Sequence, residues 1–324
     1  MNLRLGVCKL VLTSRRPAIQ CRASRVAMLL AGIALSSVSA AAQPDPSQVT
    51  IKVTPVAAGI YMLDGGGAGG NIAISVGNDD VFMIDDQYAP LTAKIRAAIA
   101  TVSPKPVRFL LNTHWHGDHV GGNENMAGAG AIIVAHDNTR KRMTKEQFIA
   151  AFNMKVPPSP AAALPIVTFS ESMSLYLNGD SVRAVHFRSA HTDGDVVVTF
   201  EKADVVHMGD IFFNGFYPLV DLGSGGSVDG IIAAVDQVLS RTTARTKFIP
   251  GHGPLGTRAD LVSYRNAVKG VRDRVAALIA RRRTLAQVVA AKPSAAYDSK
   301  WGGGFLKPDQ FVTILYSDLS RRRR

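Results

Sequence analysis

The chain has 324 residues, 47% of them hydrophobic, and a formal net charge of +12. This length can bury a large core and fits one domain of roughly 230 residues. The charge does not indicate a nucleic-acid-binding protein. Six basic residues fall in residues 1–42 and four form the C-terminal run Arg321–Arg324, while no basic stripe interleaved with aromatic residues occurs between them.

Residues 1–42 have the three parts of a secretory signal peptide. Basic residues without any acid come first, then the apolar run Val26–Leu35, then small residues ending near Ala42. The apolar run is too short to span a bilayer, so we expect no stable membrane anchor. We predict cleavage near Ala41 or Gln43 and a periplasmic protein with a net charge of +6. Ser14-Arg15-Arg16 is only a weak twin-arginine signal, which leaves Sec or twin-arginine export open.

Both cysteines of the chain lie inside this segment. Cys8 and Cys21 would be removed with it, so the mature protein would contain no thiol and no disulfide. That composition suits an oxidising compartment.

Residues 43–280 predict one domain built from two similar halves. In the first half we expect strands over 51–53, 60–63, 72–76, 81–84, 107–112 and 131–134, a helix over 91–100, and a charged surface helix over 136–152. The segment Asn78-Asp79-Asp80 is a hairpin turn signal. Residues 157–165, rich in proline and alanine, predict a crossover to the second half.

The second half repeats the order of strands followed by helix. We expect strands near 166–169, 173–177, 181–187, 195–200, 203–207 and 246–249, and helices over 228–240 and 257–280. Strands then helix, twice, predicts an α/β (α+β) protein with helices outside two packed sheets. Residues 281–324 predict a C-terminal helical extension, with helices near 284–291 and 308–318 and a disordered basic tail at Arg321–Arg324. The extension either packs on the domain or forms a partner surface.

Four potential metal ligands occur within six residues at His114-Trp115-His116-Gly117-Asp118-His119. His114 and His116 follow the strand-like run 107–112 and point the same way, because side chains alternate along an extended chain. Gly117 lets the chain turn, so that Asp118 and His119 can reach a second ion. Imidazole and carboxylate ligands without a thiolate suit Zn²⁺ or a similar divalent ion.

Three further candidate ligands lie downstream. His191 precedes the strand-like run 196–200, Asp210 follows 205–209, and His252 follows 247–249. Because all three flank apolar runs, we expect them to converge with the His114–His119 motif at one edge of the sheet core.

This constellation resembles the metallo-β-lactamase superfamily over residues 49–279. The resemblance implies a four-layer αβ/βα metallo-β-lactamase sandwich and two zinc ions per chain. It implies that His114, His116 and His191 bind the first ion, that Asp118, His119 and His252 bind the second, and that Asp210 bridges both.

The sequence departs from dedicated β-lactamases of that superfamily. They have a cysteine or serine where Asp210 stands, whereas aspartate is typical of the glyoxalase II, lactonase and RNase Z branches. The downstream lysine of many β-lactamases is also missing, since Ile211-Phe212-Phe213-Asn214 follows Asp210. With Asn214-Gly215-Phe216-Tyr217-Pro218, the pattern looks most like periplasmic relatives of the zinc β-lactamases.

Several other residues carry weaker signals. Asp85 is either a turn residue or, as the superfamily implies, a hydrogen-bond partner of a ligand histidine. Asn214 and Tyr217 follow a ligand closely and are candidates for the substrate pocket, although Tyr217 could equally fill the core. Gly65–Gly70 is either a plain hairpin loop or a flap over the site. The remaining histidines, His136, His186 and His207, are expected to be structural.

These features predict a dinuclear zinc-dependent hydrolase acting on a small-molecule substrate. A hydroxide between the ions would attack an acyl carbonyl of a cyclic amide or ester, and Asp118 would orient or shuttle the proton. The alternative is a glyoxalase II-like thioester hydrolase or a lactonase, with β-lactam hydrolysis as a side activity. Phosphodiester hydrolysis and a non-catalytic binding or redox role are weaker readings. The oligomeric state is not predicted.

Overall fold

A computed structural model describes residues 45–321 of the chain. The proposed signal peptide, its cleavage site, Cys8, Cys21 and residues 322–324 lie outside the described residues. The described part belongs to a single compact unit.

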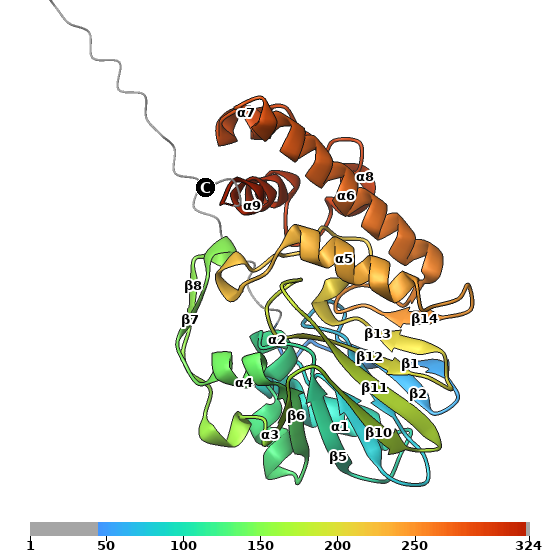
Figure 1. The fold of residues 1–324 in the computed structure, drawn as a ribbon. Coiled ribbons are helices and arrows are strands. Elements are labelled where there is room, and N and C mark those ends of the chain that lie inside the picture. The colour runs from blue at the N-terminus through green and yellow to red at the C-terminus, as the bar shows by residue number, and fades with distance from the viewer. Residues whose placement is uncertain (1–44, 322–324) are drawn as a thin grey trace, which may run out of the picture. The chain divides into compact units, whose positions relative to one another are not determined.

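The first sheet has seven strands in the order β1-β2-β3-β4-β5-β6-β9 (Figure 1). The strands are β1 (Lys52–Ala57), β2 (Ile60–Asp64), β3 (Ile72–Ser75), β4 (Val81–Ile84), β5 (Val107–Asn112), β6 (Ile132–His136) and β9 (Val167–Phe169). Pairing is antiparallel from β1 to β4 and parallel from β4 to β9. The turn signal at 78–80 does join an antiparallel pair, β3 and β4.

The second sheet has six strands in the order β10-β11-β12-β13-β14-β15. They are β10 (Ser172–Leu177), β11 (Asp180–Phe187), β12 (Asp195–Phe200), β13 (Val205–His207), β14 (Lys247–Ile249) and β15 (Gly256–Thr257). Only β13 and β14 pair in parallel.

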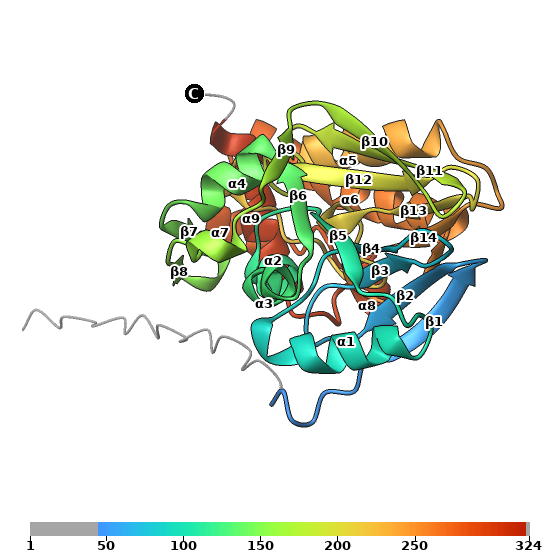
Figure 2. The same cartoon turned by 90° about the horizontal axis from the view of Figure 1, so that it is seen from below.

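Strand alternation produces the layers. In β4, Val81 and Met83 pack in one hydrophobic cluster with α1 (Thr92–Ala100), while Phe82 and Ile84 pack in another cluster against the second sheet. In β12, Val196 and Val198 face the first sheet. The next residue along, Val197, belongs to the cluster shared with α5 (Val228–Leu239) and α6 (Arg258–Ala280). The order helix, sheet, sheet, helix confirms the predicted sandwich, and Figure 2 shows α1 and α5 on opposite sides of the two sheets.

Shorter elements connect the layers. They are α2 (Gly117–Val120), α3 (Asn123–Gly128), α4 (Asp137–Met143), β7 (Gln147–Ile149), β8 (Met154–Val156), and the 3₁₀ helices η1 (Ala89–Leu91), η2 (Ala150–Phe152), η3 (Ala161–Ala163), η4 (Gly209–Ile211) and η5 (Leu222–Ser224).

Two expectations for the middle of the chain are wrong. The helix predicted over 136–152 ends at Met143, and the chain then forms the β7–β8 hairpin, with Asn153 in a left-handed conformation (φ 50°). Arg142 is drawn into a tertiary ion pair with Asp193, and the Gln147 amide donates to the Arg142 carbonyl, which outweighs local helix propensity. In addition, β9 was expected in the second half, but it joins the first sheet beside β6.

The extension beyond Ala280 packs on the domain. Its helices α7 (Leu285–Ala290), α8 (Asp298–Trp301) and α9 (Pro308–Arg321) lie beside α6 (Figure 1). Phe311 and Leu315 are fully buried in the same cluster as α5 and α6. Arg321 was expected in a disordered tail, but it ends α9 and donates to the carbonyls of Leu222 and Gly226.

Across residues 45–321, no helix is both long and apolar enough to cross a membrane.

Candidate metal centre

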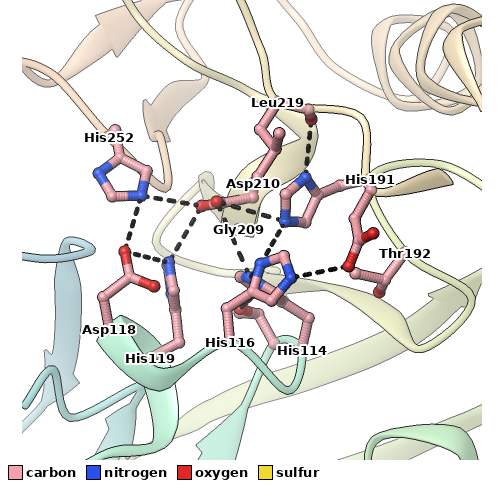
Figure 3. A network of polar contacts seen from close by, with 12 residues as sticks. His114, His116, Asp118, His119, His191, Thr192, Gly209, Asp210, Leu219 and His252 are labelled. Carbon is pink, nitrogen blue, oxygen red and sulfur yellow. Dashed lines mark hydrogen bonds and ion pairs between the residues drawn. The ribbon is translucent and has the colours of Figure 1, made fainter. Parts of the chain in front are cut away.

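Seven histidine and aspartate side chains from four separate segments meet at one edge of the two sheets (Figure 3). The segments follow β5, join β11 to β12, follow β13 and follow β14. Two groups have ligand atoms within 4.8 Å of one another: His114, His116, His191 and Asp210 form one, and Asp118, His119 and His252 form the other. The structure therefore brings together every residue predicted as a metal ligand, with Asp210 in the group of His114, His116 and His191.

In the first group, three imidazole nitrogens point at one another. His116 Nδ1 lies 3.1 Å from His114 Nε2 and 2.9 Å from His191 Nε2. One carboxylate oxygen of Asp210, Oδ2, lies 3.5 Å from His191 Nε2 and 3.8 Å from His114 Nε2.

The outer nitrogens of these rings all have acceptors. His191 Nδ1 lies 2.8 Å from the Leu219 carbonyl, and His116 Nε2 lies 3.1 Å from Asp221 Oδ2. His114 Nδ1 lies 3.1 Å from Thr113 Oγ1, whose own proton goes to Asp85. If each outer nitrogen carries the proton, all three inner nitrogens present lone pairs to one another.

Three lone pairs at about 3 Å repel unless a cation lies between them. The donor set of three neutral imidazoles and a carboxylate is one that Zn²⁺ and similar ions accept. The residues of the first group therefore fit a divalent metal ion.

The second group is arranged around the other oxygen of Asp210. Asp210 Oδ1 lies 3.1 Å from His119 Nε2 and 3.4 Å from His252 Nε2, and Asp118 Oδ2 lies 3.3 Å from His252 Nε2. His119 Nδ1 is 2.8 Å from Asp85 Oδ2, so its Nε2 is left to face Asp210. His119 Nε2 and Asp210 Oδ1 are buried and, although they lie 3.1 Å apart, neither makes a hydrogen bond, so both atoms fit ligands of a bound cation.

The two groups differ in electrostatics. Burial, with the neighbouring His119, lowers the pKa of His114 well below its usual value, and burial lowers the pKa of His191 to about 4. Burial also opposes protonation of His252, but the charges of Asp210 and Asp118 outweigh it and raise the pKa to about 9. The pKa of His119 is likewise raised, against burial, by Asp210 and Asp118.

Asp85 occupies the position expected of a partner of a ligand histidine. Besides His119, its carboxylate accepts hydrogen bonds from the backbone N–H and the hydroxyl of Thr113. Its backbone is left-handed (φ 60°), a conformation that aspartate tolerates better than most residues.

Asn214 and Tyr217, the two candidates for the substrate pocket, both contact other parts of the protein. Tyr217 is buried, stacks on Phe311 of α9 and donates its hydroxyl hydrogen to Asp298, so it fills the contact with the C-terminal extension. The Asn214 amide donates to the Pro254 carbonyl, and its backbone N–H donates to the His252 carbonyl. Asn214 therefore supports the loop that carries His252.

The remaining histidines lie outside the cluster. His136 and His186 stack at 3.5 Å between ring centroids and contact the carbonyls of Ser170 and Asp193. His207 contacts the Asn71 carbonyl.

The glycine-rich segment 65–70 ends in contact with the cluster. A Cβ on Gly70 would lie 2.2 Å from the His119 ring, so only glycine fits there. The next residue, Asn71, donates from its side chain to the carbonyls of Pro250 and Gly253 and from its backbone to Gly251. Asn71 thus fixes the loop that holds His252. The same hydrogen bonds hold the C-terminal end of the glycine-rich segment 65–70 in place.

Sequence reasoning missed two supporting residues, Asn71 and Asp221. The Asp221 carboxylate contacts His116 and also accepts the backbone N–H groups of Gly223 and Ser224. Ser224 in turn accepts from the Trp115 indole. Asp221-Leu222-Gly223-Ser224 has the composition of an aspartate-capped turn, but nothing local in the sequence indicates that this turn faces the His114–His119 motif.

An αβ/βα sandwich with a histidine and aspartate cluster at the sheet edge defines a class of metal-dependent hydrolases. Residues 65–269, more than half of the chain, match the family model of the metallo-beta-lactamase superfamily. The chain belongs to this superfamily and is a metal-dependent hydrolase.

One protein is similar to this chain in sequence, and one solved structure is similar to it in fold. A Beta-lactamase-like protein 2 homolog of Drosophila melanogaster is 24% identical over 231 residues, which are 68% of this chain and 68% of that protein. The solved structure of a metallo-beta-lactamase from Pontibacter korlensis aligns with a TM-score of 0.56 at 19% identity, covering 68% of this chain and 99% of the other. The second likeness concerns the fold alone.

Proposed function

We propose that the protein is a dinuclear zinc hydrolase that cleaves an acyl carbonyl compound, with a cyclic amide or ester as substrate. The observation that carries the proposal is the placement of Asp210. One of its oxygens faces His114 and His191, and the other faces His119 and His252. A carboxylate so placed could hold two ions side by side, one in each group.

When bound, the ions would supply the positive charge that activates a water molecule and polarises the carbonyl. Asp118 is the acid of the cluster most open to solvent, with 21% of its side chain exposed, against 5% for Asp210. Its pKa is held below the usual range, against burial, by His119 and His252. Asp118 therefore offers an ionised oxygen that would accept a hydrogen bond from the attacking water and orient it.

The nature of residue 210 supports a second candidate. Aspartate rather than cysteine stands at the shared position, which is the pattern of the glyoxalase II and lactonase branches. A thioester hydrolase or lactonase with only side activity on β-lactams is therefore the alternative. The names of both relatives refer to β-lactamases, which favours including β-lactams among the substrates tested.

We also propose that the mature protein acts in the periplasm. The three-part pattern of residues 1–42 supports this export. Mass spectrometry of protein purified from a periplasmic extract should find a chain that begins near Ala41 or Gln43. An intact N-terminus on cytosolic protein would contradict the proposal.

Metal analysis combined with a substrate panel tests the catalytic proposal. We expect about two zinc ions per chain in the wild type, about one in His252→Ala, and two in the control variant His186→Ala, whose histidine lies outside the cluster. Nitrocefin, a lactone and a thioester then serve as substrates for zinc-loaded protein. Asp210→Ala should lower kcat/KM by orders of magnitude, because the shared ligand is lost. A metal content that His252→Ala leaves unchanged, or full activity in Asp210→Ala, would refute the dinuclear mechanism.

A further inference from the structure

The C-terminal extension places an exposed phenylalanine beside the metal centre. Phe305 lies between α8 and α9 and is 42% exposed, whereas its neighbour Leu306 is buried. Its ring centroid lies 6.0 Å from the ring of His252 and 6.0 Å from that of Phe213. A residue from outside the family-matched segment therefore borders the site.

The backbone around Phe305 is held in place. A Cβ on Gly304 would lie 2.7 Å from the Phe216 ring, and the Lys307 ammonium group donates to the Gly304 carbonyl. Trp301 and Leu306 are buried on either side. The exposure of Phe305 is thus imposed by an anchored segment and is not that of a free loop tip.

A row of three phenylalanine rings in contact, here called the phenylalanine step, leads outward from the metal centre. Phe213 is buried and stacks on His252 at 5.1 Å, Phe305 follows at 6.0 Å from Phe213, and Phe152 of η2 follows at 6.1 Å from Phe305. The step runs from the metal centre to the β7–β8 hairpin. That hairpin also exposes Phe148 and Met154. Those two side chains lie on opposite faces of the hairpin, so Phe152 is the hairpin residue shown to contact Phe305.

The open side of the metal centre coincides with this step. His252 and Asp118 are the most exposed cluster members, at 15% and 21% of their side chains. The β7–β8 hairpin and the metal-binding motif also line one cavity of about 230 Å³, to which Gly117 and Val156 contribute. Asp118 contacts His252, and Phe305 borders the other side of the His252 ring, so both lie on the open side of the metal centre.

Aromatic side chains border the metal centre beside His252. His252 contacts the side chains of Asp118, Asp210 and His119, which belong to the metal centre itself, and the rings of Phe213 and Phe305. Of the two rings, Phe213 is fully buried and Phe305 is 42% exposed, so Phe305 is the one open to a substrate. Its ring cannot accommodate a charged or strongly polar group without a desolvation cost, and it favours an aromatic or bulky aliphatic group.

We propose that Phe305 and Phe152 form a subsite for an apolar group carried beside the scissile carbonyl, so that the preferred substrates are acyl compounds with an aromatic or bulky aliphatic substituent. The inference rests on the proposed acyl hydrolysis for its kinetic test, but the subsite itself can be tested by binding alone.

Binding of product-like carboxylates provides the test that does not depend on turnover. Calorimetry with zinc-loaded protein should show that phenylacetate binds at least about tenfold more tightly than acetate, since both share the carboxylate and differ in the ring. Phe305→Ala should bring the affinity for phenylacetate close to that for acetate, and Phe305→Leu should retain part of the difference. The control Tyr176→Ala removes an aromatic ring that is 80% exposed on β10 and should change nothing.

The kinetic test uses two thioesters of one thiol, phenylacetyl and acetyl. Wild type should prefer the phenylacetyl thioester in kcat/KM by about 10- to 100-fold. Phe305→Ala should lose this preference, with the loss in kcat/KM falling mainly on the phenylacetyl thioester, while its zinc content stays that of the wild type. Equal losses on both thioesters, or equal binding of phenylacetate and acetate by the wild type, would overturn the subsite. If the wild type binds phenylacetate preferentially but hydrolyses neither thioester nor any other acyl compound, the proposed function fails and the subsite stands.

Discussion

At the scale of single residues, the metal centre depends on acceptors that fix which nitrogen of each histidine faces inward. Asp85 holds His119, the Leu219 carbonyl holds His191, and Asp221 holds His116. Partners of this kind set the tautomer and orientation of a ligand histidine before the ion arrives. A change that alters the partner but leaves the ligand in place should therefore weaken metal binding.

Asp221→Asn tests this at one position. Asparagine can still accept from His116 and from the turn at Gly223, but the negative charge that supports His116 as a ligand is lost. We expect a roughly 10- to 100-fold weaker affinity for one of the two ions, measured by competition with a chromophoric chelator. The control Asp236→Asn changes a surface aspartate paired with Arg265 and should leave the affinity unchanged. Equal affinities in both variants would show that Asp221 does not position His116.

The pKa values of histidines in the two ligand groups are shifted in opposite directions, so the two groups should release different numbers of protons when they bind metal. In metal-free protein the pKa of His252 is raised to about 9, so at pH 7 this ring is protonated and must lose its proton to bind an ion. The pKa of His191 is lowered to about 4, so that ring is neutral at pH 7 and needs to lose nothing.

Calorimetry of zinc binding at pH 7, in buffers with different ionisation enthalpies, measures this release. We expect one binding event with release of at least about one proton and another with almost none. Raising the pH from 6 to 8 should strengthen the proton-releasing event roughly tenfold per pH unit for each proton released. His252→Ala should remove much of that release. Equal release from both events would contradict the assignment of protonated and neutral rings.

At the scale of elements, the fold delivers ligands by ending strands at one edge. β5 and β14 end just before His114 and His252, and β13 ends three residues before Asp210. The same region also joins the core to the extension, because Tyr217, seven residues after Asp210, stacks on Phe311 and donates to Asp298. The hydroxyl of Tyr217 therefore stabilises the packing of the core against the C-terminal extension.

Tyr217→Phe should lower the free energy of unfolding by about 1–3 kcal/mol, because it removes a partly buried hydrogen bond to a carboxylate and keeps the ring stacking. Urea denaturation measures the change. Tyr316→Phe is the matched control, since its hydroxyl makes only a long, exposed contact of 3.4 Å with the Arg283 carbonyl. Its unfolding free energy should change by less than about 0.5 kcal/mol. A larger effect of Tyr217→Phe on zinc content than on stability would contradict this structural role.

At the scale of the whole described chain, residues beyond Ala280 complete the core of the second half. Phe311, Val312 and Leu315 are buried in one cluster with α5 and α6. The Asp318 carboxylate of α9 accepts the backbone N–H of Val228 at the start of α5. Without α9, this apolar surface and this helix end would be exposed to water.

Truncation after Ala280 should therefore prevent stable folding, and the milder change Phe311→Ala should cost about 3–5 kcal/mol of unfolding free energy. Circular dichroism during thermal and urea denaturation provides the measurement. Removal of residues 322–324 alone is the control, and we expect no change in Tm. A truncated protein that folds with wild-type stability would show that the extension is dispensable for the core.

The local sequence determined the individual elements and the candidate ligands. Alternating apolar runs predicted most strands within a few residues, and the spacing of His114, His116, Asp118 and His119 predicted a metal-binding loop, because both depend on the geometry of neighbouring residues. The sequence failed where a distant contact overrides local preference. The helix expected to continue beyond Met143 instead gives way to the β7–β8 hairpin, and β9 joined the first sheet because a free parallel edge was available beside β6.

The tertiary structure alone decided which residues support the centre. Asp221 lies 105 residues from His116, and Asn71 lies 179 residues from Pro250, so no local pattern could link them. It also decided that the extension packs on the domain, that Tyr217 faces α9 and that Phe305 faces His252. Ligand identity is a property of side-chain chemistry and close spacing, which a sequence displays directly. Proximity between remote segments arises only when the sheets and helices pack, because packing sets the distances between residues that the chain leaves far apart.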